Sequence, residues 1–331
     1  MPPLLPSAEI LVKALRDRMI NVIDLTAPLS DSTPVLPLPE GMEPIPHFAL
    51  EELARYDERG ETSYQNGIRT GEHVGTHFDA PCHWITGRDL ADVASVPPEE
   101  LISPFVVIDK SQEAADNPDF LLEIEHVQEW EQRHGALPTG GWLLYRSGWD
   151  RRSTDQQQFI NADERGPHTP GVSVECAKWL ASETLIRGLG VETVGIDAGQ
   201  AFAFDPPFPC HHYLLGAGKY GVTQLQNLES LPTVGGVLVV APLKIVGGRE
   251  APPECWQSST HQLNHRRRRA DPCMFATRSA EHCTNSVSAW HSEWLVAATS
   301  TTRTLSWTPE PASLLLATKV EPLSWQMHTH A

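Results

Sequence analysis

The chain has 331 residues, of which 40% are hydrophobic and 20% are charged, so it can bury a substantial core and is not disordered as a whole. A formal net charge of −17 at pH 7 argues against a nucleic-acid partner, because phosphate binding needs a basic surface. No apolar run approaches the roughly 20 residues of a membrane span, and the start lacks the features of a secretory signal. Six cysteines without a CxxC pair suit a reducing compartment. We therefore expect a cytoplasmic, acidic protein that binds neither nucleic acid nor membrane.

Strand-like and helix-like patterns alternate along the first 250 residues. Compact apolar runs predict strands at residues 21–26, 104–109, 142–146, 192–197 and 237–246. Helical periodicity predicts helices at residues 123–133 and 174–187, and Gly188 is a plausible stop for the second. Because the two patterns are interleaved in one continuous stretch, the fold class is predicted to be α/β, in a single domain.

The amino-acid usage changes near residue 250. Residues 1–250 hold 18 Lys and Arg against 36 Asp and Glu, whereas residues 251–331 hold 7 against 6. The last segment also contains five of the ten tryptophans and shows little sustained periodicity. We therefore divide the chain into an N-terminal segment (1–19), an α/β domain (20–248) and a poorly structured C-terminal extension (249–331) without a catalytic role. The alternative is a partner-binding tail.

One short segment concentrates the residue types that bind metals. Three histidines and one aspartate fall within eleven residues, namely His73, His77, Asp79 and His83. In an extended chain these odd-numbered positions face one side of the backbone, and a bend at Gly75 or Pro81 could direct all four into one cavity. Imidazole and carboxylate ligands suit Zn²⁺ or Mn²⁺, and three protein ligands leave a position open for water. The alternative is a set of polar loop residues without a ligand role.

The same segment carries a family resemblance. Residues 73–83, HVGTHFDAPCH, match the HxGTHxDxPxH signature of the metal-dependent cyclase family, which includes isatin hydrolases and bacterial kynurenine formamidases. Other similar segments are residues 24–26, 144–150, 169–173, 195–197, 211–218 and 227–232. The resemblance covers roughly residues 20–248 and is closest to the isatin hydrolases. It implies a domain of the swivelling β/β/α type and a homodimer or homotetramer.

The resemblance also implies roles for the signature residues. His73, His77 and Asp79 correspond to the primary metal ligands. His83 corresponds to the catalytic base or proton carrier beside the metal-bound water. The implied cofactor is a divalent metal, Mn²⁺ or Zn²⁺.

A second group of family ligands is incomplete in this chain. Kynurenine formamidases add a later histidine and, about twelve residues beyond it, a glutamate. Counting from His211 leads to Thr223, and counting from His212 leads to Gln224, so neither count supplies a carboxylate. The amide oxygen of Gln224 could be a weak ligand or bind a ligand water, so His212 and Gln224 are further candidate metal residues. A single-metal site is the expected arrangement.

These residues predict hydrolysis without a protein nucleophile. A divalent ion lowers the pKa of bound water and polarises a carbonyl, and His83 can pass the water proton to the leaving nitrogen. There is no GxSxG elbow, and Cys82 is as well explained as a buried apolar residue. We expect a metal-dependent amidohydrolase that acts on a non-peptide C–N bond of a small cyclic aromatic amide such as isatin. The alternatives are an arylformamidase that acts on N-formylkynurenine in tryptophan catabolism and an inactive, cyclase-like binding protein.

An aromatic substrate requires an aromatic-lined pocket. Trp84 follows the last histidine of the signature, and Phe208 belongs to a Pro-rich stretch just before His211. Aromatic residues in such positions are nevertheless more often ordinary core residues than pocket residues. Asp197 either holds a residue of the site by a hydrogen bond or caps a turn at the end of its strand. The sequence alone does not decide between these roles.

Overall fold

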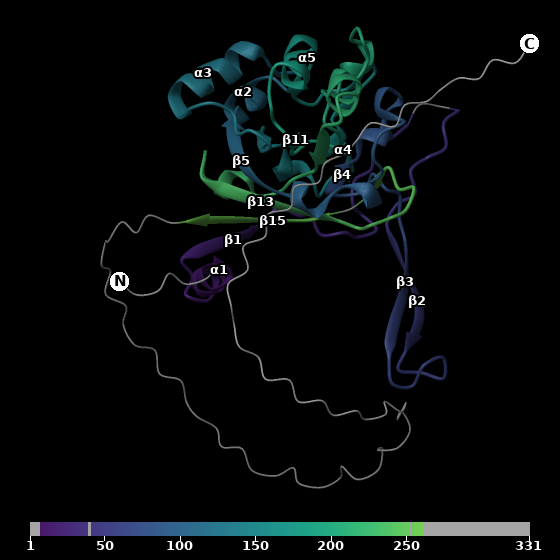
Figure 1. Cartoon of the computed structure of the whole chain (residues 1–331). Coiled ribbons are helices and arrows are strands. Elements are labelled where there is room, and N and C mark those ends of the chain that lie inside the picture. Colours follow the sequence, from purple (N-terminus) through teal and green to yellow (C-terminus); the bar gives the residue numbers. More distant parts are fainter. Residues whose placement is uncertain (1–6, 39–40, 252, 261–331) are drawn as a thin grey trace, which may run out of the picture. The chain divides into compact units, whose positions relative to one another are not determined.

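In the computed structural model, a mixed sheet of nine strands organises the described part of the chain, which comprises residues 7–38, 41–251 and 253–260 (Figure 1). The strand order is β1-β15-β13-β5-β7-β11-β12-β4-β14. The four central strands β5, β7, β11 and β12 are parallel, and the flanking pairings are antiparallel. The bounds are β1 Ile20–Asp24, β4 His77–Asp79, β5 Ile102–Asp109, β7 Trp142–Arg146, β11 Gly188–Val191, β12 Tyr220–Thr223, β13 Gly236–Pro242, β14 Glu250–Ala251 and β15 Pro253–Thr260. The predicted α/β class is confirmed.

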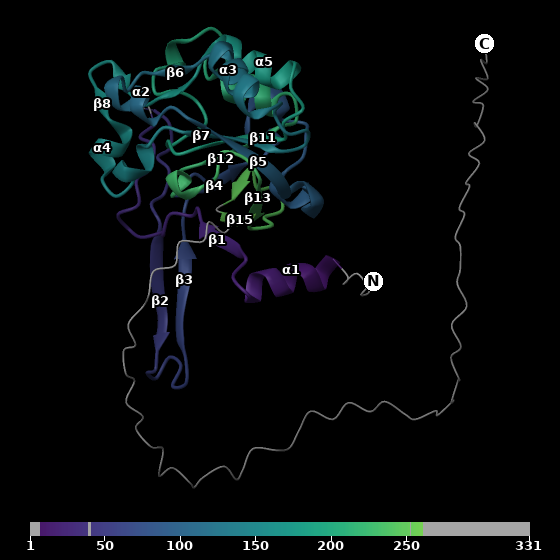
Figure 2. The ribbon, with the colours of Figure 1, turned by 90° about the vertical axis from the view of Figure 1, so that its left-hand side faces the viewer.

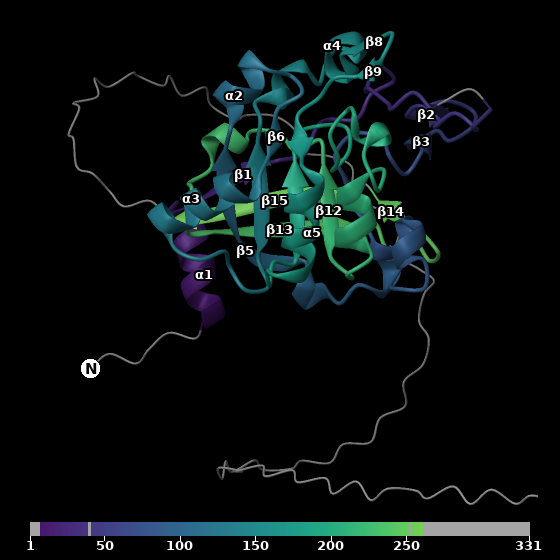
Figure 3. The ribbon, with the colours of Figure 1, turned by 90° about the horizontal axis from the view of Figure 1, so that it is seen from above.

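Both faces of the central strands are buried, as their nearly continuous apolar sequences require. On one face, Leu143 and Tyr145 of β7 pack in a cluster with Leu180 of α5 (Val174–Ser182) and Trp130 of α3 (Ile124–His134). Figure 3 shows these helices lying over the sheet. On the other face, the alternate residues of β5 and β7 form a second cluster with residues of β4, β12 and β13. The sheet therefore holds its strand ends rigidly in place.

The remaining elements include three further α-helices and three two-stranded sheets. The other helices are α1 Ser7–Arg16, α2 Ser111–Asp116 and α4 Gln156–Ile160, and the small sheets pair β2 Ala49–Arg55 with β3 Tyr64–Arg69, β6 Leu121–Leu122 with β10 Gly171–Val172, and β8 Ala162–Asp163 with β9 Gly166–Pro167. The hairpin β2–β3 extends away from the nine-stranded sheet (Figure 2). None of the helices in the described ranges is long and apolar enough to cross a membrane.

The strand predicted at residues 192–197 is wrong. The strand is β11, at Gly188–Val191, and residues 192–197 form the bends that follow it. Gly188, predicted as a helix stop, lies inside this strand. A Cβ at Gly188 would stand 2.5 Å from the Trp142 ring, and a Cβ at Gly190 would stand 2.5 Å from Leu144, so both positions require glycine. Alternate glycines thus make room for the large side chains of β7. The predicted helix is also shorter, since α5 ends at Ser182.

The expected end of the domain at Gly248 also needs correction. β14 pairs with β4, and β15 lies between β1 and β13, with pairs that run from Ile20↔Thr260 to Asp24↔Trp256. These strands are held by main-chain hydrogen bonds, which do not require a particular side-chain pattern. The altered amino-acid usage after residue 250 therefore gave no sign of them. The part of the extension beyond Thr260 lies outside the described residues.

Candidate functional site

The predicted metal ligands lie on or just before β4, which borders the parallel strands of the sheet. His77 and Asp79 belong to β4, which pairs with β12, and their side chains share one face because strand positions alternate. His73 precedes the strand, across a bend at Gly75, whose φ is +67°. Pro81 begins the short 3₁₀ helix Pro81–His83, which ends the extended run. Both predicted bends are therefore present.

The three ligand residues form a cluster suited to one ion. One ligand atom from each of His73, His77 and Asp79 lies within 4.8 Å of the other two. Donor atoms that bind one ion at about 2 Å are at most roughly 4 Å apart, so small side-chain rotations would let all three residues reach one ion. Two imidazoles and one carboxylate match the donor preference of Zn²⁺ and Mn²⁺. The chemistry and spacing of the donors therefore fit a divalent metal.

Backbone contacts orient His77 for this role. Its Nδ1 lies 2.9 Å from the Gly75 carbonyl oxygen, which can only accept, so Nδ1 carries the proton. Its Nε2 is then the nitrogen that carries no proton, and this atom lies 3.4 Å from Asp79 Oδ1 and 3.1 Å from the Thr223 hydroxyl oxygen. The Thr223 hydroxyl lies 3.0 Å from Nδ1. A fixed tautomer of this kind is typical of metal-binding histidines.

Two residues that shape the cluster were not singled out from the sequence. Gly221 of β12 lies opposite Asp79, and a Cβ there would stand 2.7 Å from Asp79 Oδ2. Thr76 accepts a hydrogen bond from the Ala27 amide and donates one to the Gln224 carbonyl, each at 2.8 Å. The glycine leaves space for the carboxylate, and the threonine ties the loop to its neighbours. The only sequence signal for this threonine was its place in the family signature, between Gly75 and His77.

A chain of imidazole rings extends from the metal cluster. The His83 ring lies 4.7 Å from that of His73 and 5.3 Å from that of His211. His211 in turn packs against Trp84, with ring centres 4.7 Å apart, and the Trp84 and Phe208 ring centres are 5.6 Å apart. His83, Trp84, Phe208 and His211 are all half-buried. The structure thus brings His83 and an aromatic wall beside the metal cluster.

The other candidate metal residues are placed differently. Of the adjacent histidines His211 and His212, the former faces His83, while the His212 ring packs 4.7 Å from the Tyr213 ring. Gln224 is buried and contributes its main-chain carbonyl to Thr76. The assignment of His212 and Gln224 as ligands stays a prediction. The ring contacts favour His211 over His212 as the residue that completes the site.

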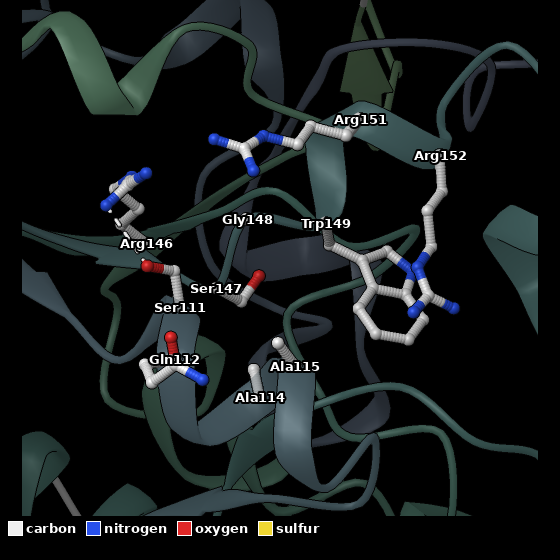
Figure 4. A pocket seen from close by; sticks show the side chains of 10 residues that line it. All are labelled: Ser111, Gln112, Ala114, Ala115, Arg146, Ser147, Gly148, Trp149, Arg151 and Arg152. Atoms are coloured by element: carbon white, nitrogen blue, oxygen red, sulfur yellow. Dashed lines mark hydrogen bonds between the residues drawn. The ribbon is translucent and has the colours of Figure 1, made fainter.

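A separate polar cavity of about 180 Å³ lies at the ends of β5 and β7 (Figure 4). Arg146 and Arg151 line it, but both guanidinium groups contact Glu229, and Arg146 also pairs with Asp109. Next to the cavity-lining residues Ser147 and Trp149, the buried Glu192 accepts hydrogen bonds from the main-chain amides of both. Burial raises the pKa of Glu192 to about 7. The cavity contains none of the predicted ligands, and its arginines are already paired.

Cys82 has no features of a nucleophile. Its side chain is buried, and burial raises the pKa of the thiol. A thiol nucleophile needs the opposite shift, because the thiolate is the reactive form. The candidate chemistry of the site therefore rests on the histidines and Asp79.

Comparison with known proteins agrees with this geometry. Residues 23–198 match the family described as "Putative cyclase". The chain belongs to this cyclase family. The isatin hydrolase of Roseibium aggregatum is 41% identical over 236 residues, which span 70% of this chain and 89% of that protein. A kynurenine formamidase of Salinibacter ruber is 25% identical over 234 residues, which span 70% of this chain and 94% of that protein.

Solved structures of this cyclase family show the same fold. Isatin hydrolase A from Ralstonia solanacearum matches with a TM-score of 0.75 and 42% identity, over 78% of this chain and 99% of that chain. An isatin hydrolase bound to the product analogue thioisatinate matches with a TM-score of 0.75 and 38% identity, over 77% of this chain and 98% of that chain. The predicted resemblance to isatin hydrolases is thus confirmed.

Proposed function

We propose that this protein is a metal-dependent amidohydrolase that opens the amide C–N bond of a small cyclic aromatic substrate such as isatin. The single observation that carries the proposal is the His73, His77 and Asp79 cluster, with the His83 ring directly beside it. The 41% identity to an isatin hydrolase supports the choice of substrate. The bond is a non-peptide C–N bond, and the nucleophile is water.

His73, His77 and Asp79 would hold one Mn²⁺ or Zn²⁺ ion. A divalent ion bound there supplies a lowered pKa for a water molecule and polarisation of the substrate carbonyl. His83 removes a proton from the attacking water and delivers it to the departing nitrogen, as an imidazole can near neutral pH. Trp84 and Phe208 flank His83 and His211, so they offer flat apolar surface to an aromatic ring.

A linear arylformamide such as N-formylkynurenine is the second candidate substrate. The kynurenine formamidase at 25% identity supports a shared reaction type. Thr223, however, contacts His77 through a hydroxyl group at the position where a count from His211 would require a glutamate. We therefore prefer a single-metal site and the cyclic amide.

Hydrolysis of isatin and N-formylkynurenine by one metal-analysed preparation tests the proposal. We expect a higher kcat/KM for isatin and about one bound metal ion per chain. A higher kcat/KM for N-formylkynurenine would favour the second candidate. A preparation with its metal bound that hydrolyses neither compound would favour the inactive binding protein.

We further propose that the protein works as a homodimer or homotetramer in the cytoplasm. Leu50 and Ile68 form a cross-strand pair on the β2–β3 hairpin, and they are 57% and 70% exposed. An isolated two-stranded hairpin is marginally stable in water, so contact with a second copy would stabilise it. Light scattering should give a multiple of the 36.6 kDa chain mass, and Leu50→Glu with Ile68→Glu should shift the protein towards the monomer. A monomer in the unaltered protein would contradict this assembly.

A further inference from the structure

The Asp197 carboxylate contacts both the ring and the main chain of His211. Asp197 is buried, and its Oδ1 accepts a hydrogen bond from the Cys210 amide at 2.7 Å. Its Oδ2 accepts from the His211 amide at 3.2 Å and lies 2.5 Å from His211 Nδ1. One carboxylate therefore holds both the main chain and the ring of this histidine.

The segment that carries Asp197 is itself tightly packed. A Cβ at Gly171 would stand 2.3 Å from the Ala198 amide nitrogen, and a Cβ at Gly199 would stand 2.5 Å from the Pro167 carbonyl oxygen. Each glycine thus allows a backbone approach that a side chain would prevent. Asp197 consequently acts on His211 from a fixed position.

The contact with Asp197 sets the tautomer of His211. A carboxylate accepts hydrogen bonds, so Nδ1 of His211 carries the proton and Nε2 keeps its electron pair. The ring packs against those of Trp84 and His83, with centres 4.7 Å and 5.3 Å away. The His211 ring, with one unprotonated nitrogen, therefore lies next to the ring of the proposed catalytic base.

We propose that Asp197 is a positioning residue that holds His211 as the acceptor for the N–H group of a secondary-amide substrate. This inference rests on the proposed function. The amide nitrogen is bonded directly to the carbonyl carbon, so a group that recognises the nitrogen must lie close to the group that activates water. His211, beside His83, meets this requirement. The site consequently prefers amides with an N–H group to N-alkylated amides of the same shape.

Isatin and N-methylisatin provide the test, with kcat/KM measured for both. Loss of one buried hydrogen bond corresponds to a roughly 10- to 100-fold preference for isatin in the unaltered protein. In Asp197→Asn, the side-chain amide can donate to His211 Nδ1, which moves the ring proton to Nε2. We expect the preference to fall towards unity in this variant, mainly through loss of isatin turnover. The same preference in both proteins would overturn the proposal.

A matched control comes from a second aspartate–histidine pair in the chain. Asp119 Oδ2 lies 2.7 Å from His168 Nδ1, and Asp119→Asn should leave the preference for isatin unchanged. A fall in the preference of this control equal to that of Asp197→Asn would refute a specific role for Asp197. Should Asp197→Asn fail to fold, His211→Phe keeps a ring against Trp84 and should also abolish the preference.

The ring tautomer can be measured independently of activity. In zinc-loaded protein with ¹⁵N-labelled histidine, the nitrogen resonances should show protonated Nδ1 for His211, and in Asp197→Asn they should show protonated Nε2. Protonated Nε2 in the unaltered protein would contradict the proposal. If the unaltered protein hydrolyses neither isatin nor N-methylisatin, the proposed function fails, and calorimetric binding of the two compounds then tests the same preference.

Discussion

Removal of the strands that follow Gly248 should abolish folding, whereas removal of the residues after Thr260 should not. A chain that ends at Gly248 lacks β14, which pairs with the metal-binding strand β4, and β15, which joins β1 to β13. It also lacks Arg249, whose carbonyl accepts the Ala80 amide hydrogen bond at 3.0 Å. A chain that ends at Thr260 keeps all of these contacts.

The size of the effect follows from the two ladders of β15. Five residue pairs join it to β1, and seven join it to β13. Antiparallel ladders average about one hydrogen bond per pair, so about twelve are lost. At about 0.5–1.5 kcal/mol each, the total is about 6–18 kcal/mol. This range matches the whole unfolding free energy of a typical domain, about 5–15 kcal/mol.

Thermal unfolding and metal analysis of the two truncated chains give the assay. We expect the chain that ends at Thr260 to keep the Tm and metal content of the full chain, and the chain that ends at Gly248 to be insoluble or to show no cooperative transition. A milder variant, Gln257→Pro, removes ladder bonding in mid-strand and should cost about 3 kcal/mol, or about 6–12 °C in Tm. A folded, metal-binding chain that ends at Gly248, or an unchanged Tm for Gln257→Pro, would refute the reasoning.

Three substitutions test individual side chains. Asp79→Asn removes the negative ligand and should lower metal affinity by at least tenfold by equilibrium dialysis, and unchanged affinity would contradict its role. His83→Ala should keep its metal but lose roughly 10²- to 10⁴-fold in kcat, whereas purification without metal would identify His83 as a ligand. Burial raises the pKa of Glu192 from 4.5 to about 7, so the native state keeps a proton that the unfolded state releases. Stability from this proton is fully present below about pH 4.5 and is lost, by about 3 kcal/mol, as the pH rises to about 7. Glu192→Gln should flatten this slope in denaturant titrations, and an identical slope would contradict the buried-carboxyl account.

Much of the central sheet could be predicted because its strands are short apolar runs. The strand at residues 142–146 was predicted with its observed bounds, since both of its faces are buried. The strand at Gly188–Val191 could not be recognised, because its two glycines are explained only by the neighbouring side chains of β7. Likewise, β14 and β15 are held by backbone pairing to partners that are distant in the sequence.

The metal cluster could be predicted because its ligands are close in the sequence. Alternation along a strand places His77 and Asp79 on one side, and the bends allow His73 to approach them. The choice between His211 and His212 could not be made from spacing, since it depends on how a one-turn π-helix (His211–Leu215) meets the rings of the signature loop. Asp197 was equally open, because its contact with His211 spans a loop whose path the sequence does not specify.

The most direct test of the central claim is the dependence of isatin hydrolysis on metal in a single preparation. The protein is stripped with a chelator, its metal content is measured, and Mn²⁺ or Zn²⁺ is then titrated back while isatin hydrolysis is followed. We predict that activity falls with the metal and returns in proportion to occupancy, with saturation near one ion per chain. Isatin hydrolysis at full rate by protein without metal would contradict the account, as would metal-loaded protein that does not hydrolyse isatin.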